Sequence, residues 1–205
     1  MANILHDLAH LYHDQKRFTD AETYFRRTFT IFEEILGPEH SSTFHILECL
    51  AHLYYERKQY TEAETAFQQI LTVKDKMFGP DSPSAIFEMN HLARLYRDQR
   101  RYAEAESFFQ RVLFLREKEL GPDDHDTAAT LHDLALLYAD QKRYIEAETY
   151  FQRTLAICEN ESSSNNHDTA IVLQNYASLL LKMKRPVKAA RLTARAMALR
   201  TKPSL

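Results

Sequence analysis

The sequence repeats itself at an interval of 42 residues, and this interval constrains the fold more than any other feature of the chain. The residues that return in phase are Ala21, Ala63, Ala105, Ala147 and Ala189; Phe25, Phe67, Phe109 and Phe151; Tyr12, Tyr54, Tyr96 and Tyr138; and Gly37, Gly79 and Gly121, each followed by proline. Repetition at a fixed period predicts stacked units that bury their apolar faces against their neighbours. We expect one array over residues 1–205, with repeats at approximately 1–41, 42–83, 84–125, 126–167 and 168–205.

Each unit has the pattern of two helices. In the first unit Leu5, Leu8, Ala9 and Tyr12 follow the spacing of one helix face, and a second apolar helix ends at the Gly37-Pro38 step. A serine or an aspartate stands just ahead of the first helix in each of the last four units. These residues are the predicted N-caps: Ser42, Ser84, Asp126 and Asp168. In the fifth unit Pro186 replaces an aromatic residue, so this unit is a degenerate C-terminal cap.

The repeat resembles the tetratricopeptide repeat, in the 42-residue form of kinesin light chains. The resemblance is carried by the stretches 120–122 (LGP), 134–138 (LALLY) and 143–148 (RYIEAE), and it covers essentially the whole chain. It implies an all-α fold, a right-handed α-solenoid of antiparallel helix pairs. One position departs from the family, which commonly has glycine between the two helices, where this chain has Lys16, Lys58, Arg100, Lys142 and Lys184. A left-handed turn at a non-glycine residue costs about 1 kcal/mol, and the sequence leaves the conformation of this turn open.

Composition narrows the class of protein further. The chain has 205 residues with 44% hydrophobic residues, only 3 glycines, and a net charge of -3. Three glycines are too few for a Gly-rich phosphate loop. The negative net charge argues against nucleic acid as a partner. No apolar run is long enough to span a bilayer, which predicts no membrane association. Two isolated cysteines, Cys49 and Cys158, are consistent with a reducing compartment, so we expect a cytoplasmic protein.

One strip of each first helix lies opposite its apolar face and differs from repeat to repeat. In the resembling family this strip lines a concave groove, which implies that it binds a protein or peptide partner. The candidate partner-binding residues are Asn3, His6, Asp7, His10, His13, His45, His52, Tyr55, Asn90, His91, Arg94, Arg97, His132, Asp133, Leu136 and Asn175. Asn175 matches the family's groove asparagine, whereas the first four repeats have other residues there. Varied side chains on a uniform scaffold are typical of a recognition surface.

Arg94 and Arg97 project from one face of the central repeat and predict an acidic residue in the partner segment. Neither belongs to the apolar face, so their removal should leave the fold intact. From Lys182 to Lys202 the chain carries eight basic residues and no acidic ones. Such a run is typical of a solvated cap, and a docking site for an acidic partner is the alternative.

Other functions have less support in the sequence. No motif of a hydrolase, metalloprotease or nucleotide-binding enzyme is present, so we expect no enzymatic activity and no cofactor. His6 and His10, four residues apart, could share a metal ion. We favour a solvated polar groove here, because no carboxylate or cysteine completes a ligand set within one turn. The remaining alternative is a self-associating scaffold in which the uncapped first repeat stacks on another copy. The interaction module itself is expected to be a sensor or scaffold part of a larger protein.

Overall fold

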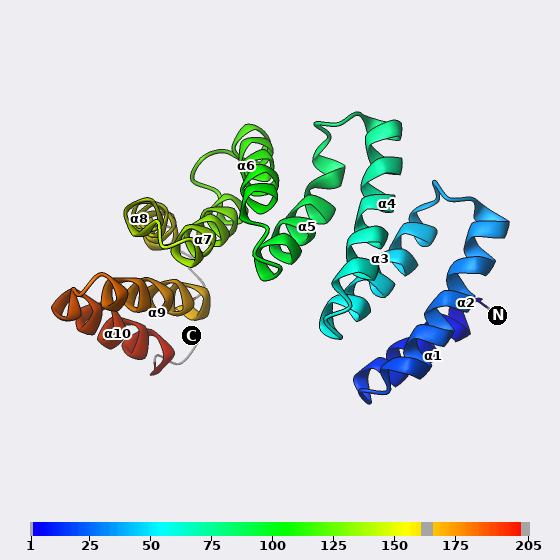
Figure 1. Ribbon diagram of the computed structural model, residues 1–205, viewed down its shortest axis with the longest axis horizontal. Helices are drawn as coiled ribbons and strands as arrows, with labels where there is room; N and C mark the ends of the chain where they lie inside the picture. The colour runs from blue at the N-terminus through cyan, green and yellow to red at the C-terminus, as the bar shows by residue number, and fades with distance from the viewer. Residues whose placement is uncertain (1, 161–165, 202–205) are drawn as a thin grey trace. The chain divides into compact units, whose positions relative to one another are not determined.

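The computed structural model describes residues 2–160 and 166–201, and in these ranges the chain consists of helices joined by turns and short loops (Figure 1). The elements are α1 (Ala2–Asp14), α2 (Phe18–Leu36), α3 (Ser41–Glu56), α4 (Tyr60–Phe78), η1 (Pro83–Ala85, a single 3₁₀ turn), α5 (Ile86–Asp98), α6 (Tyr102–Glu119), α7 (His125–Asp140), α8 (Tyr144–Asn160), α9 (Asn166–Lys182) and α10 (Pro186–Thr201). The predicted all-α class and the ten helices are confirmed for the described residues. None of these helices is long and apolar enough to cross a membrane.

The helices form two compact units, residues 1–100 and 101–205. In the N-terminal unit α1 packs on α2, α2 on α3, α3 on α4, and α4 on α5. In the C-terminal unit the same succession runs from α6 to α10. Within each unit, each helix thus packs against the next one along the chain, as expected for stacked helix pairs. That residues 1–205 form one array stays a prediction.

The core of each unit consists of the residues that return at the 42-residue interval. Phe25, Phe67, Phe109 and Phe151 are each no more than 1% exposed. The second-helix alanines, for example Ala63, are at most 2% exposed. A larger side chain there would hold the two helices of a pair apart. Three of the four tyrosines of the repeat, Tyr54, Tyr96 and Tyr138, are buried core residues as well, whereas Tyr12 is half-buried.

A hydrogen bond at a repeated position joins neighbouring repeats. The Tyr54 hydroxyl donates to a Glu22 carboxylate oxygen at 3.0 Å, and the Tyr138 hydroxyl donates to Glu106 at 2.9 Å. Tyr96 and Glu64 make the same bond at 3.0 Å. Because a buried hydroxyl without a partner is costly, the glutamate on each second helix fixes the position of the following first helix.

The predicted N-caps are wrong by two residues. The His40 imidazole accepts a hydrogen bond from the amide of Ser42 at 3.1 Å, and the Asp124 carboxylate accepts one from the amide of Asp126 at 2.8 Å. Ser82 is the corresponding cap of η1. The apolar pattern misplaced these caps because the first turn of each helix is polar and carries no periodicity. Asp168 likewise lies inside α9, which begins at Asn166.

The turn inside each helix pair, which the sequence left open, is left-handed. The φ angles of Lys16, Lys58, Arg100, Lys142 and Lys184 lie between 58° and 62°. Two backbone hydrogen bonds close the first of these turns, from Lys16 to the His13 carbonyl at 2.8 Å and from Arg17 to the Tyr12 carbonyl at 2.9 Å. These bonds satisfy carbonyls at the end of α1 and offset the cost of a side chain in the left-handed region.

Candidate binding surface

The predicted strip lies on the first helix of each repeat, on α1, α3 and α5 in the N-terminal unit and on α7 and α9 in the C-terminal unit. Its best-defined feature is a cluster on α1 and α3. The Nε2 atoms of His6 and His10 are 2.9 Å apart, and the Cys49 sulfur lies 3.8 Å from Nε2 of His10 and 4.0 Å from Nε2 of His45. One ligand atom from each of these four residues lies within 4.8 Å of the other three.

Burial changes the protonation behaviour of this cluster. It lowers the pKa of both His6 and His10, and the proximity of the other imidazoles lowers them further. It raises the pKa of the Cys49 thiol to about 11. The imidazoles of His6 and His10 are therefore neutral and the Cys49 thiol is protonated near neutral pH. The contact between His6 and His10 is a hydrogen bond between a protonated and an unprotonated ring nitrogen.

A second pair of histidines, His52 on α3 and His91 on α5, is enclosed by aromatic rings. Their ring centroids are 4.4 Å apart. The His91 ring stacks on Phe67 at 5.2 Å and contacts Phe87 at 4.4 Å. Burial, with the nearby His52 and Arg94, lowers the pKa of His91 to about 3. These two residues form an uncharged aromatic wall of the strip, because burial lowers the pKa of both.

Other strip residues of the N-terminal unit make contacts within the fold. His13 Nε2 lies 3.0 Å from a Glu56 carboxylate oxygen. The Tyr55 hydroxyl donates a hydrogen bond to Asp98. Arg97 lies 3.5 Å from the same carboxylate group, and its side chain is only 19% exposed. Arg97 thus lies beside the Tyr55–Asp98 pair at the end of α5, and that its removal leaves the fold intact stays a prediction.

Two of the predicted residues, Asn3 and Asp7, are exposed on α1, whereas Asn90 on α5 is half-buried. Asn3 and His6 line a surface pocket together with Phe32, His45 and Ile46. This pocket opens beside the histidine–cysteine cluster, so the cluster is accessible to solutes.

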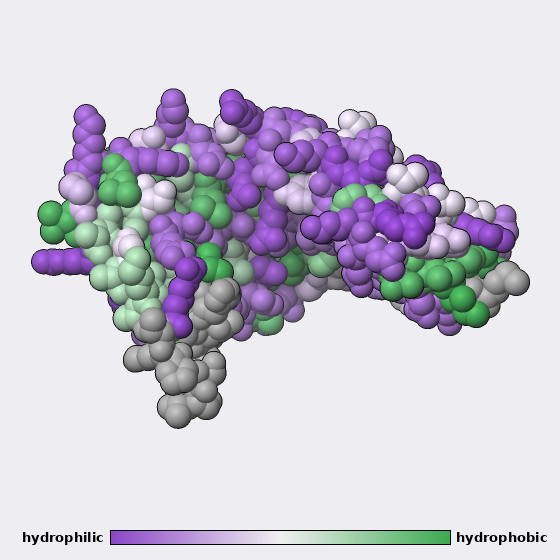
Figure 2. Space-filling view, turned by 90° about the horizontal axis from the view of Figure 1, so that it is seen from below, coloured by the Kyte–Doolittle hydropathy of each residue, from purple (hydrophilic) through white to green (hydrophobic). Residues whose placement is uncertain are grey.

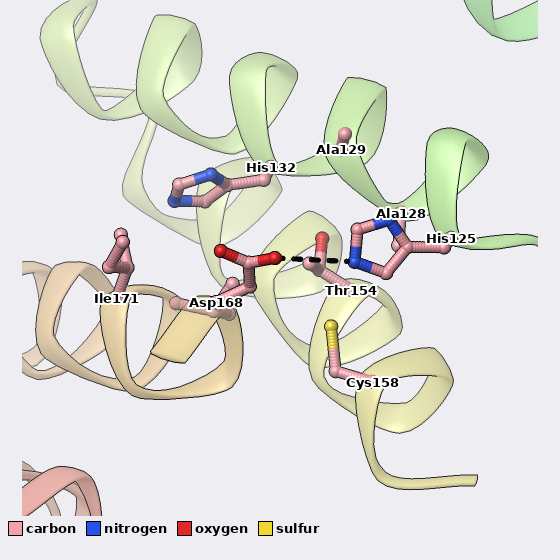
Figure 3. A pocket seen from close by; sticks show the side chains of 9 residues that line it. His125, Ala128, Ala129, His132, Thr154, Cys158, Asp168 and Ile171 are labelled. Atoms are coloured by element: carbon pink, nitrogen blue, oxygen red, sulfur yellow. Dashed lines mark ion pairs between the residues drawn. The ribbon is translucent and has the colours of Figure 1, made fainter. Parts of the chain in front are cut away.

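In the C-terminal unit the strip borders a cavity of about 250 Å³ (Figure 3). Figure 3 shows His125 and His132 on α7 facing Asp168 on α9, and Nε2 of His125 lies 3.6 Å from the Asp168 carboxylate. The cavity is otherwise mostly apolar, with Cys158 from α8 among its lining residues.

The remaining predicted residues of this unit differ in how far they can reach a partner. Asn175 and His132 are joined by a hydrogen bond of 3.0 Å. Asp133 is only 5% exposed, so it is buried in the fold and offers little surface to a partner. Leu136 is half-buried.

Sequence reasoning missed two groupings. It found the spacing of His6 and His10 but not the addition of His45 and Cys49, which are also four residues apart and were the available signal. It also missed a buried ion-pair group in which Lys74 Nζ lies 2.7 Å from Glu88 and 3.7 Å from Glu48. These three residues come from three helices, and the repeat pattern gives no sign that they meet.

Comparison with protein families gives one consistent match. The family model described as tetratricopeptide repeat matches residues 1–76, 42–118, 84–160 and 126–202. Successive matches start 42 residues apart, in register with the interval of the sequence. No curated protein matches the chain.

Solved structures share the fold at low sequence identity. BtubC (BKLC) from P. vanneervenii has a TM-score of 0.83 and 21% identity, over 97% of this chain and 81% of that one. A Podosopora anserina kinesin light chain with nearly identical TPR-like repeats has a TM-score of 0.80 and 22% identity, over 98% and 97%. The Rap protein complexed with competence and sporulation factor has a TM-score of 0.71 and 17% identity, over 97% and 54%.

Proposed function

Because this chain belongs to the tetratricopeptide repeat family, we propose that it is a protein–protein interaction module that binds a peptide or protein segment along the strip of its first helices. The family match covers the chain from residue 1 to residue 202. Among the proteins that share the fold, Rap was crystallised in complex with competence and sporulation factor. That complex supports a binding role for the fold. The residues of the strip support binding of a specific partner segment.

The observation that carries the proposal is the contrast between core and strip. Ala51, Ala93 and Ala135 occupy one core position in successive repeats, and each is 0% exposed. At the neighbouring strip position the residues are His52, Arg94 and Leu136. Packing requires the first set to be the same, whereas nothing in the fold requires the second to differ. Differences at one position of a repeated scaffold are what discrimination between partner segments needs.

Arg94 is the strip residue best suited to select a partner. It is half-buried on α5, next to the uncharged aromatic wall formed by His52 and His91. A partner carboxylate at this place would lose water on binding, and truncating one member of a desolvated charge pair costs about 2–5 kcal/mol. We therefore propose a segment with an acidic residue at Arg94 and an apolar residue against the histidine wall.

The test is selection of ligands from a random peptide library, followed by affinity measurement by fluorescence anisotropy. Selected peptides should be enriched in acidic residues, and Arg94→Ala should weaken their binding at least about tenfold, which corresponds to about 1.4 kcal/mol. Arg27→Ala is the matched control, because Arg27 is an exposed arginine of α2, outside the strip. Peptides that bind Arg94→Ala as tightly as the parent protein would place recognition elsewhere.

A second candidate function, self-association through end-to-end stacking, is favoured by exposed apolar residues. Ile4 and Leu11 on α1 are 65% and 51% exposed, while Ile46 and Leu53 at the same positions of α3 are 1% and 0% exposed. Figure 2 shows apolar surface at its right-hand end, over the N-terminal helix pair. The position at which a first helix meets the preceding repeat is therefore uncovered on α1.

The complementary surface lies on α10. Met197 is 60% exposed, whereas Leu155 at the same position of α8 packs against Ala170 and Leu173 of the following helix. A contact between α1 of one copy and α10 of another joins two different surfaces, so it would form chains of molecules. Ile4→Lys and Met197→Lys should each abolish such assembly in sedimentation velocity. Ile145→Lys, at a residue 76% exposed on α8, should not, and a monomer at all concentrations would rule this function out.

We further propose that the chain has no enzymatic activity, acts in the cytoplasm, and serves as a sensor or scaffold part of a larger protein. The family membership supports the first of these, because tetratricopeptide repeats carry interaction surfaces and no fixed catalytic set. Isolation of the partner complex from the cytoplasmic fraction of the parent cell would test the second and third of these.

A further inference from the structure

Four residues with metal-binding side chains converge between the first two repeats. His6 and His10 are one turn apart on α1, and His45 and Cys49 are one turn apart on α3. Pairs at this spacing leave one face of a helix together, so two helices can supply two ligands each. We propose that His6, His10, His45 and Cys49 bind one Zn²⁺ ion, which would cross-link α1 to α3.

The distances fit a tetrahedral site. With Zn–N bonds of about 2.0–2.1 Å and a Zn–S bond of about 2.3 Å, tetrahedral ligand atoms lie roughly 3.3–3.6 Å apart. The distances between neighbouring ligand atoms here are 2.9, 3.8 and 4.0 Å, and all four atoms lie within 4.8 Å of one another. Small side-chain rotations are enough to bring them to bonding positions around one ion.

Two of the three imidazoles are already oriented for this role. His6 directs Nε2 to the cluster, while its Nδ1 lies 3.8 Å from the Asp7 carboxylate. His45 directs Nε2 to Cys49, while its Nδ1 lies 3.8 Å from the Glu48 carboxylate. In zinc sites the ring nitrogen that does not bind the metal commonly donates to a carboxylate, which fixes the tautomer and orients the ring.

The donor set determines the type of metal and of site. Three imidazoles and a thiolate favour Zn²⁺ over Mg²⁺ or Ca²⁺, which prefer oxygen ligands. Four protein ligands complete the tetrahedron and leave no position for water or substrate, so the site is structural and not catalytic. Binding replaces the thiol proton of Cys49, which passes to solvent. The pocket lined by Asn3, His6 and His45 provides the entry path.

Titration of the reduced, metal-free protein with Co²⁺ tests the proposal, because tetrahedral Co²⁺ with a thiolate ligand has intense visible bands and a charge-transfer band in the near ultraviolet. We expect one Co²⁺ per chain, displaced by one Zn²⁺, and a higher melting temperature with Zn²⁺. Cys49→Ser should remove the charge-transfer band, and Cys158→Ser should retain it. His10→Ala should weaken Zn²⁺ binding by more than about 100-fold, since losing an outer-shell partner alone costs 10–100-fold.

His125→Gln is the matched histidine control, because His125 is an exposed histidine outside the cluster. Circular dichroism of each metal-free variant establishes that it is folded, and His45→Asn, at an exposed residue, replaces any variant that is not. An octahedral Co²⁺ spectrum, unsaturable binding, or binding insensitive to Cys49→Ser and His10→Ala would overturn the proposal. The titration uses the metal alone, so its outcome is independent of the partner-binding experiments.

Discussion

Replacing Lys74 by methionine should destabilise the N-terminal unit by about 3–5 kcal/mol, because it would leave the buried Glu88 carboxylate without its cation. Lys74 Nζ lies 2.7 Å from Glu88, whose side chain is 0% exposed, and 3.7 Å from Glu48. Surface ion pairs contribute at most about 1 kcal/mol, but a buried carboxylate cannot recover its interaction energy from water. The size of the effect therefore comes from the burial of Glu88.

The repeats themselves provide the compensating substitution. At the positions equivalent to Lys74 and Glu88, the preceding junction has Phe32 and Ile46, two apolar residues. Because apolar residues of similar volume can replace a buried ion pair at no cost, or with a gain of about 1–4 kcal/mol, the double variant Lys74→Met/Glu88→Ile should recover most or all of the loss.

Urea denaturation followed by far-ultraviolet circular dichroism, on the parent, both single variants and the double variant, gives the coupling energy directly. Arg27→Met serves as a control for the loss of one exposed cation from a second helix. If Lys74→Met costs less than about 1 kcal/mol, the value of an exposed pair, the burial argument is wrong. A double variant as unstable as the sum of the singles would equally refute it.

Three further predictions concern single positions. Leu92→Ala, at a residue 0% exposed, should cost about 2–5 kcal/mol in urea denaturation by leaving a cavity. Lys142→Gly should raise the stability by up to about 1 kcal/mol because φ is 62° there, whereas Lys142→Ala should give no gain; a loss with glycine would show that the turn is not strained. The folded-state pKa of His91, about 3, is below its unfolded value of about 6.5. Stability should therefore be complete above pH 6.5 and decline as the pH falls toward 3, by at most about 1.4 kcal/mol per pH unit for this residue, and His91→Phe should reduce that decline in melts across the pH range.

The repeat interval determined most of the fold, because each unit is specified by local helix patterns and by contacts to its neighbours. Phe67, Ala63 and Tyr54 could be assigned to the core from their recurrence alone, and all three are buried. Features that depend on one or two backbone angles were harder to predict from the sequence. Capping by His40 in place of Ser42, and the left-handed turn at Lys58, depend on the geometry of polar turns that have no apolar period.

The sequence likewise determined one part of the candidate site, and the tertiary structure decided the other. The sequence by itself placed His6 and His10 on one helix face, and it identified the strip whose residues differ between repeats. Only the tertiary structure brought His45 and Cys49 to them, because that contact depends on the rotation and separation of α1 and α3. The meeting of Lys74 with Glu88 has the same origin. Helix periodicity fixes which side chains share a face, whereas the packing of one helix on another decides which faces meet.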